Sequence, residues 1–202
     1  DIAIIGVSGR YPQARDLQTL WANLRDGRDC ITEIPAERWD HTRYYDPDKS
    51  KVGTTYTKWG GFIDGVDEFD AQFFSISPRE AEFTDPQERL FLQCVHAAIE
   101  DAGYTRERLG ESARHRVGVY VGVALGEYGL FGAELQARGV NIGVSSPPAT
   151  IANRVSYYCN FHGPSMAIDT MCSSSLTALH SACESIRSGR CEAAIVGGVN
   201  LN

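Results

Sequence analysis

One cysteine stands where the chain is expected to turn from a strand into a helix. The segment 169–180 reads DTMCSSSLTALH and places Cys172 just before three serines. The residues before it, 165–168, predict a short strand. After it, apolar side chains recur at helical spacing, at Leu176, Leu179, Cys183 and Ile186. Cys172 therefore lies at a predicted strand-to-helix corner.

Such a corner can make a thiol reactive. A thiolate attacks carbonyl carbon far better than a thiol does, and the unpaired amides of a helix N-terminus stabilise its negative charge. The same amides can hold the oxyanion that forms when a thioester carbonyl is attacked. Free cysteines are, however, mostly buried and behave as small apolar side chains. Position alone leaves both readings open for Cys172, and we expect the packing role for Cys30, Cys94, Cys159, Cys183 and Cys191.

The histidines offer no obvious base for this thiol. His180 lies eight residues beyond Cys172, which is about 12 Å along a helix. His162 precedes the short strand and His96 falls in a helix, and neither spacing places an imidazole beside the sulfur. The pairs His180/Cys183 and Cys159/His162 lack the further ligands of a tetrahedral zinc site, so we expect no metal.

Predicted strands and helices alternate along the chain. The apolar runs that predict strands are 2–7, 117–123, 165–168 and 193–199. A helix after Asp16 carries Leu17, Leu20, Trp21 and Leu24 on one face and ends at Gly27, and another helix covers 149–157. The clearest helix opens at Asp85 with Pro86 in its first turn, and Glu88 and Arg89 there are explained by capping and helix pairing. The alternation predicts an α/β fold with layers of helices over a buried sheet.

The glycines of the strands and the residues of the corner are expected to shape close contacts. Gly118 and Gly122 lie in the strand 117–123, where a missing side chain lets another backbone approach. Asp169 and Thr170 are expected to form side-chain to backbone hydrogen bonds at the corner. Residues 28–80 differ in composition from the rest of the chain: they contain many turn residues and aromatics, and their apolar residues show no long periodic spacing. They predict an extended insertion anchored by its aromatic side chains.

Composition excludes several classes of protein. The chain has 202 residues and a net charge of −7, which argues against nucleic-acid binding because phosphates need clustered positive charge. No apolar run approaches the length of a membrane span, so we expect no membrane partner. The six cysteines contain no paired C-x-x-C spacing, and a reduced, cytoplasmic setting is the simpler interpretation.

A known family has the same residues around the corner. The segment 163–176, GPSMAIDTMCSSSL, resembles the nucleophile motif of β-ketoacyl synthases, in particular the ketosynthase domains of modular polyketide synthases. Further matches follow in family order: Ile4-Ile5-Gly6, Arg10-Tyr11-Pro12, Asp85-Pro86-Gln87-Glu88-Arg89, Glu100-Asp101-Ala102-Gly103, the strand 117–122 and Gly197-Gly198-Val199-Asn200. The resemblance runs the length of the chain.

The resemblance implies a thiolase-like fold of two related α/β halves that works as a homodimer. It implies that residues 1–202 are the N-terminal portion and that the C-terminal half, with two catalytic histidines and a lysine, lies beyond Asn202. Cys172 would accept an acyl chain from the phosphopantetheine arm of an acyl carrier protein, with no cofactor bound covalently to the domain. A malonyl-type extender would then lose carbon dioxide and attack the acyl group in a decarboxylative Claisen condensation.

The resemblance also leaves alternatives. The residue before the nucleophile is commonly small in the family, whereas here it is Met171, which is expected to border the acyl channel and affect substrate preference. A non-elongating ketosynthase that only passes the acyl chain on would carry the same motif. A catalytically silent module for dimerisation or carrier docking, and a thiolase acting on coenzyme A thioesters, fit the residues less well.

Overall fold

The computed structural model of the protein describes residues 1–140 and 146–201. Contacts divide the chain into two units, one formed by Asp1–Val7 and Val66–Asn202, the other by Ser8–Gly65. The predicted corner belongs to the first of these units.

Three parallel strands form the sheet of the larger unit. They are β3 (Val117–Gly122), β4 (Ser165–Ile168) and β5 (Ala193–Gly198), in the order β4-β3-β5. The central strand β3 is buried along its whole length, as a run of apolar residues predicts. Its last residue, Gly122, is level with Ile168 of β4 and Gly198 of β5. The carboxyl ends of all three strands therefore meet at one edge of the sheet.

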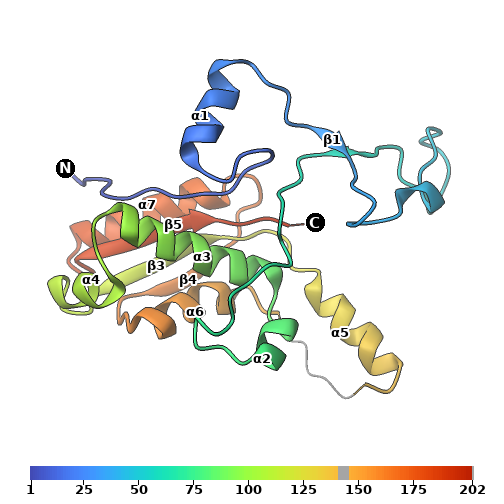
Figure 1. Ribbon diagram of the computed structural model, residues 1–202. Helices are drawn as coiled ribbons and strands as arrows, with labels where there is room; N and C mark the ends of the chain where they lie inside the picture. Colours follow the sequence, from blue (N-terminus) through green and yellow to red (C-terminus); the bar gives the residue numbers. More distant parts are fainter. Residues whose placement is uncertain (141–145, 202) are drawn as a thin grey trace. The chain divides into compact units, whose positions relative to one another are not determined.

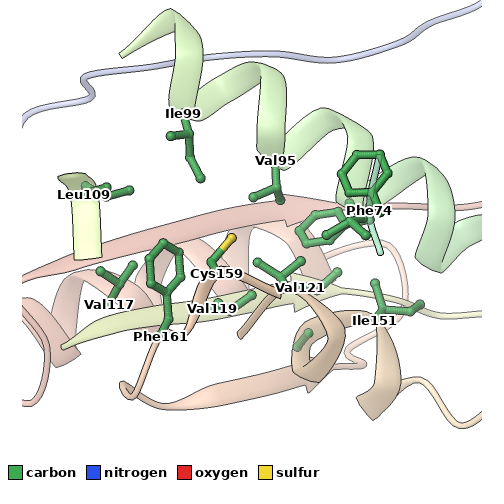
Figure 2. Close-up of a cluster of buried hydrophobic side chains, with 14 of the residues drawn as sticks. Phe74, Val95, Ile99, Leu109, Val117, Val119, Val121, Ile151, Cys159 and Phe161 are labelled. Atoms are coloured by element: carbon green, nitrogen blue, oxygen red, sulfur yellow. The ribbon is translucent and has the colours of Figure 1, made fainter. Parts of the chain in front are cut away.

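Helices cover both faces of this sheet. Helix α7 (Ser174–Arg187) packs on one face, and α3 (Pro86–Asp101) and α6 (Ala149–Cys159) lie over the other (Figure 1). Figure 2 shows Val117, Val119 and Val121 of β3 in the main core, with Val95 and Ile99 of α3 and Ile151 and Cys159 of α6. On the α7 side, Tyr120 packs with Ala178 and Ala182. Shorter helices complete the unit: α2 (Pro78–Phe83), α4 (Arg106–Ser112) and α5 (Tyr128–Ala137).

The helix predicted after Asp85 forms as expected. Asp85 is its N-cap and accepts a hydrogen bond from the Gln87 N–H at 2.8 Å, while Pro86 stands in the first turn. The predicted helix 149–157, the two later strands and the helix after Cys172 are confirmed as well. Helices α2, α4 and α5 were not predicted, because these short helices lack a long apolar period.

The smaller unit contains α1 (Leu17–Arg25), a 3-10 helix (His41–Arg43) and the antiparallel pair β1 (Thr32–Glu33) and β2 (Trp59–Gly60). The Asp16 carboxylate caps α1 by accepting a bond from the Thr19 N–H at 2.7 Å, as predicted. The expected apolar face of this helix is not buried within its unit, because Trp21 and Leu24 are exposed.

The prediction of a strand at residues 2–7 is wrong. No strand is assigned there, and this segment runs along helix α3 instead of pairing with the sheet. A side chain at Gly6 would meet the Ala98 carbonyl oxygen at 2.3 Å, and the Val7 N–H donates to the Asp101 carboxylate at 2.9 Å. Contacts with helix α3 therefore hold this segment in place, although its apolar residues are typical of a strand.

The aromatic-rich region does not coincide with one unit of the structure. The smaller unit ends at Gly65, short of the end of the expected insertion over 28–80. Phe74 is buried in the main core of the larger unit, stacked on Phe69 at 5.1 Å between ring centroids. None of the helices in the described part of the chain is long and apolar enough to cross a membrane.

Candidate functional site

Cys172 lies in the short corner between β4 and α7, as the sequence predicts. It is exposed, whereas Cys159 and Cys191 are buried and Cys30, Cys94 and Cys183 are partly buried; all six are free thiols. Burial raises the pKa of the Cys159 thiol to about 12, so this thiol stays protonated at neutral pH. Cys172 is thus the thiol that an external reagent can reach directly.

Side-chain hydrogen bonds fix the backbone of the corner. The Asp169 carboxylate accepts a bond from the Met171 N–H at 2.9 Å. The Ser174 hydroxyl accepts a bond from the Thr170 N–H at 2.9 Å and donates to the Met171 carbonyl at 2.6 Å. The side-chain to backbone bond expected of Asp169 is confirmed. Thr170 takes part in the hydrogen bonds of the corner through its backbone N–H and through its hydroxyl.

A second set of hydroxyls ties the corner to the first turn of α7. The Ser173 hydroxyl donates to the Thr170 carbonyl at 2.7 Å, and the Thr177 hydroxyl donates to the Ser173 carbonyl at 3.0 Å. The hydroxyl oxygens of Thr170 and Thr177 lie 3.0 Å apart. Ser173 is the N-cap residue but makes no capping bond from its side chain to the helix amides. The helix therefore presents its positive N-terminus without a capping hydroxyl beside the thiol.

Met171 has an unusual backbone conformation. Its φ angle is +56°, in the left-handed region that favours glycine. This conformation costs a residue with a side chain roughly 1–2 kcal/mol. The hydrogen bonds of the Met171 backbone with the Asp169 carboxylate and the Ser174 hydroxyl offset that cost. The Met171 side chain is 70% exposed, so it is free to contact whatever approaches Cys172.

Two glycines let α7 start close to the sheet. A side chain at Gly122, at the end of β3, would meet the Ser175 backbone nitrogen at 2.6 Å. A side chain at Gly198, at the end of β5, would collide with the Ser175 hydroxyl. The close approach expected at Gly122 is confirmed, and the neighbouring backbone is that of the helix that follows Cys172.

Gly122→Ala is expected to displace the start of α7, because the added methyl would press on backbone that cannot rotate away. We expect a loss of about 2 kcal/mol in the free energy of unfolding and a changed rate of Cys172 alkylation by iodoacetamide. Gly129→Ala in α5 is the control: nothing lies within 4 Å of the added methyl, and a helical alanine should stabilise by about 0.5–1 kcal/mol. Equal stability of the two variants would contradict this role of Gly122.

Within residues 1–140 and 146–201, the histidine side-chain bonds found join His115 and His162 to Asn160 and His96 to Glu100, and none of them involves the Cys172 thiol. His115 and His162 stack on each other with ring centroids 5.4 Å apart, and His96 packs against Phe73. Across the same described residues, no three His, Cys, Asp or Glu side chains are grouped as a metal site requires.

Sequence reasoning missed a buried polar cluster at the start of α3. Gln87 and Glu88 are almost fully buried there. The Arg154 guanidinium donates to the Glu88 carboxylate at 2.8 Å and also pairs with Glu80 at 2.8 Å. Glu88 was expected to serve helix pairing, because its long-range partner Arg154 is 66 residues away. No local pattern in the sequence indicates this pairing.

Comparison with known proteins identifies the family to which this chain belongs. The whole chain, residues 1–202, matches the family described as "Beta-ketoacyl synthase, N-terminal domain". It is 64% identical to the polyketide synthase PksL of Bacillus subtilis and 64% identical to the polyketide synthase ThaG of Burkholderia thailandensis. All of the chain is covered in both alignments, but it spans only 4% of either relative.

Solved structures agree with this match. The oxazolomycin ketosynthase domain OzmH KS7 of Streptomyces albus has a TM-score of 0.94 at 55% identity, over 98% of this chain and 34% of that one. The ketosynthase from module 6 of the bacillaene synthase of Bacillus subtilis has a TM-score of 0.86 at 40% identity, over 99% of this chain and 32% of that one. The fold is thus the α/β, thiolase-like fold of ketosynthases. The chain belongs to the β-ketoacyl synthase family, as the N-terminal portion of a ketosynthase domain of the polyketide synthase type.

Proposed function

We propose that Cys172 accepts an acyl chain from the phosphopantetheine thioester of an acyl carrier protein. The observation that carries this proposal is the exposed Cys172 thiol at the N-terminus of α7, in a corner whose backbone is fixed by hydrogen bonds. In the proposed step, the thiolate attacks the thioester carbonyl and forms a new carbon–sulfur bond. The carrier thiolate leaves and takes up the proton that Cys172 released. The proposed step uses no cofactor bound covalently to the ketosynthase domain itself.

The second proposed step extends the chain by two carbons. A malonyl-type extender on a carrier loses carbon dioxide, and the resulting carbanion attacks the carbonyl of the acyl-cysteine in a Claisen condensation. The Cys172 thiolate is the leaving group, so the thiol is regenerated. We propose that the histidines and lysine for this step lie in the C-terminal half of the domain, in accordance with the family resemblance.

Intact-mass spectrometry of the full ketosynthase domain tests both steps. After incubation with a butyryl pantetheine thioester, we expect a mass gain of one butyryl group, mapped by peptide digestion to Cys172. Addition of a malonyl-loaded carrier protein should then release the extended product. An adduct on another residue would contradict the proposed nucleophile. Loading without extension would instead support a non-elongating ketosynthase that only passes the acyl chain along.

We propose that Met171 borders the acyl chain and affects substrate preference. Its side chain is 70% exposed beside Cys172, and each methylene in an apolar site is worth roughly 1–3 kcal/mol of discrimination. Met171→Ala is therefore expected to shift the ratio of acylation rates for branched over linear acyl thioesters by about tenfold. Val52→Ala, at an exposed apolar residue of the smaller unit, is the control. If Met171→Ala left this ratio of acylation rates unchanged, the proposal that Met171 borders the acyl chain would be wrong.

We propose that the domain forms a homodimer through the edge strand β4. This strand pairs with β3 on one side and has no partner strand on the other among the described residues. Met166 of β4 and Leu176 and Leu179 of α7 are exposed, and an unprotected edge with apolar neighbours favours association. Sedimentation velocity should show a dimer that Met166→Arg weakens. A monomer at micromolar concentration in the unaltered domain would contradict this arrangement.

The remaining partners follow from the relatives. Both polyketide synthases are far longer than this chain, which spans 4% of either. We therefore propose that the domain works beside other polyketide synthase domains and their acyl carrier proteins, in the cytoplasm.

A further inference from the structure

Gln87 joins two segments that are distant in the sequence. The residue lies in the first turn of α3 and is 2% exposed. Its side-chain Nε2 donates to the Leu125 carbonyl oxygen at 2.8 Å. Its side-chain Oε1 accepts a bond from the Leu201 N–H at 3.2 Å. A single buried amide thus satisfies backbone groups in two different loops.

Both loops leave the edge of the sheet at which Cys172 lies. Leu125 follows β3, Leu201 follows β5, and Cys172 follows β4. Because the strands are parallel in the order β4-β3-β5, the loop with Leu125 is next to the corner of Cys172, and the Val123 N–H donates to the Ile168 carbonyl at 3.1 Å. Ligand sites of parallel sheets form among the loops at this edge.

The position of Gln87 is itself tightly determined. Its backbone N–H donates to the Asp85 carboxylate at 2.8 Å, and Asp85 also accepts a bond from the Ser146 hydroxyl. The next residue, Glu88, is held by Arg154 of α6. The amide is therefore presented from a rigid helix start, and removing it would leave the Leu125 carbonyl and the Leu201 N–H without this partner.

We propose that Gln87 is a positioning residue of the ketosynthase reaction, which holds the loops after β3 and β5 as walls of the acyl site beside Cys172. The inference rests on the proposed function, because these walls matter only if Cys172 receives an acyl chain. Leu125 is placed to contact that chain, since its backbone is held by Gln87 while its side chain is 41% exposed.

The test compares Gln87→Met with Gln93→Met in the intact ketosynthase domain. Gln93 stands on the same helix, and its side chain donates to the Glu68 carbonyl at 3.4 Å, outside these loops. Two rates are measured for each variant: acylation of Cys172 by a butyryl pantetheine thioester, and alkylation of Cys172 by iodoacetamide. A small reagent needs only an accessible thiolate, whereas the thioester needs the walls. We expect Gln87→Met to lose about 10- to 100-fold in acylation, as for misplaced substrate, and to keep its alkylation rate within about twofold.

A third variant separates a hydrogen-bonding role from simple packing. In Gln87→Glu the introduced carboxyl, when protonated, can donate to the Leu125 carbonyl and accept from the Leu201 N–H, whereas its ionised form cannot donate. Because this carboxyl would face a carbonyl in a buried place, we expect its pKa to be raised. The acylation rate of Gln87→Glu, divided by that of the unaltered domain at each pH, should therefore rise as the pH falls through that pKa.

The outcomes distinguish the inference from the proposed function. If the unaltered domain is not acylated on Cys172, the proposed function fails. If it is acylated, but Gln87→Met reacts as fast as Gln93→Met, the inference fails. A parallel fall of acylation and alkylation in Gln87→Met, or a pH-independent ratio for Gln87→Glu, would also overturn it.

Discussion

Cys172→Ala is expected to abolish acyl loading of the intact ketosynthase domain. Among the described residues, Cys172 is the one cysteine that is exposed, and removal of a covalent nucleophile costs roughly 10⁴-fold or more in rate. The fold should survive, because an exposed side chain that makes few contacts contributes little to stability. The measurement is the mass gain from a butyryl thioester, combined with the thermal unfolding midpoint of the same sample.

Two further variants sharpen this expectation. Cys172→Ser keeps an oxygen at the site, but a hydroxyl ionises far less readily than a thiol, so we expect acylation to fall by several orders of magnitude. Cys183→Ala changes a partly buried cysteine on the same helix and should load normally. Acyl loading of Cys172→Ala at the unaltered rate would show that another group is the nucleophile.

Arg154→Met is expected to have the largest effect on stability. The substitution leaves the Glu88 carboxylate, whose side chain is 6% exposed, without its positive partner. Removing one member of a buried ion pair typically costs about 3–5 kcal/mol, because the other charge stays buried and uncompensated. Burial lowers the pKa of Arg154, but the hydrogen bonds and negative charges of Glu88 and Glu80 together outweigh it and raise that pKa above its ordinary value, so the guanidinium is charged at any working pH. Urea denaturation at fixed protein concentration measures the loss.

The matched variants test whether the uncompensated charge is the cause. Glu88→Gln combined with Arg154→Met removes that charge and should restore about 2 kcal/mol of the loss. Arg187→Met breaks an exposed pair with Glu184 on α7 and should change stability by at most about 1 kcal/mol. If Arg154→Met lowered the free energy of unfolding no more than Arg187→Met does, the buried pair would not be important for the packing of α6 on α3.

Cys172→Ala and Arg154→Met change two connected parts of the larger unit. The Arg154–Glu88 pair joins α6 to the start of α3 on one face of the sheet. The first turn of α3 in turn presents Gln87 to the loops at the carboxyl edge, where Cys172 also lies. The buried polar cluster at the start of α3 thus connects helix packing to the loops at the edge of the sheet where the exposed Cys172 lies.

Elements with local sequence signals could be predicted before the structure was known. Asp85 followed by Pro86 predicted the start of α3, because a capping carboxylate and a fixed φ angle act within one helical turn. The strand-helix switch around Cys172 was equally readable, since the residues on either side change their apolar period there. The family resemblance then favoured a nucleophile over a packing cysteine as the prediction for Cys172, a choice that position alone left open.

Features that depend on partners distant in the chain could be seen only in the folded structure. The apolar segment 2–7 has the composition of a strand, but contact with Ala98 and Asp101 makes it lie along a helix. The order β4-β3-β5 places Gly122 under the start of α7. Gln87 contacts residues 38 and 114 positions away, and no local pattern records such separations. Burial and hydrogen bonding between remote segments are properties of the folded chain, and for this reason they became visible only in three dimensions.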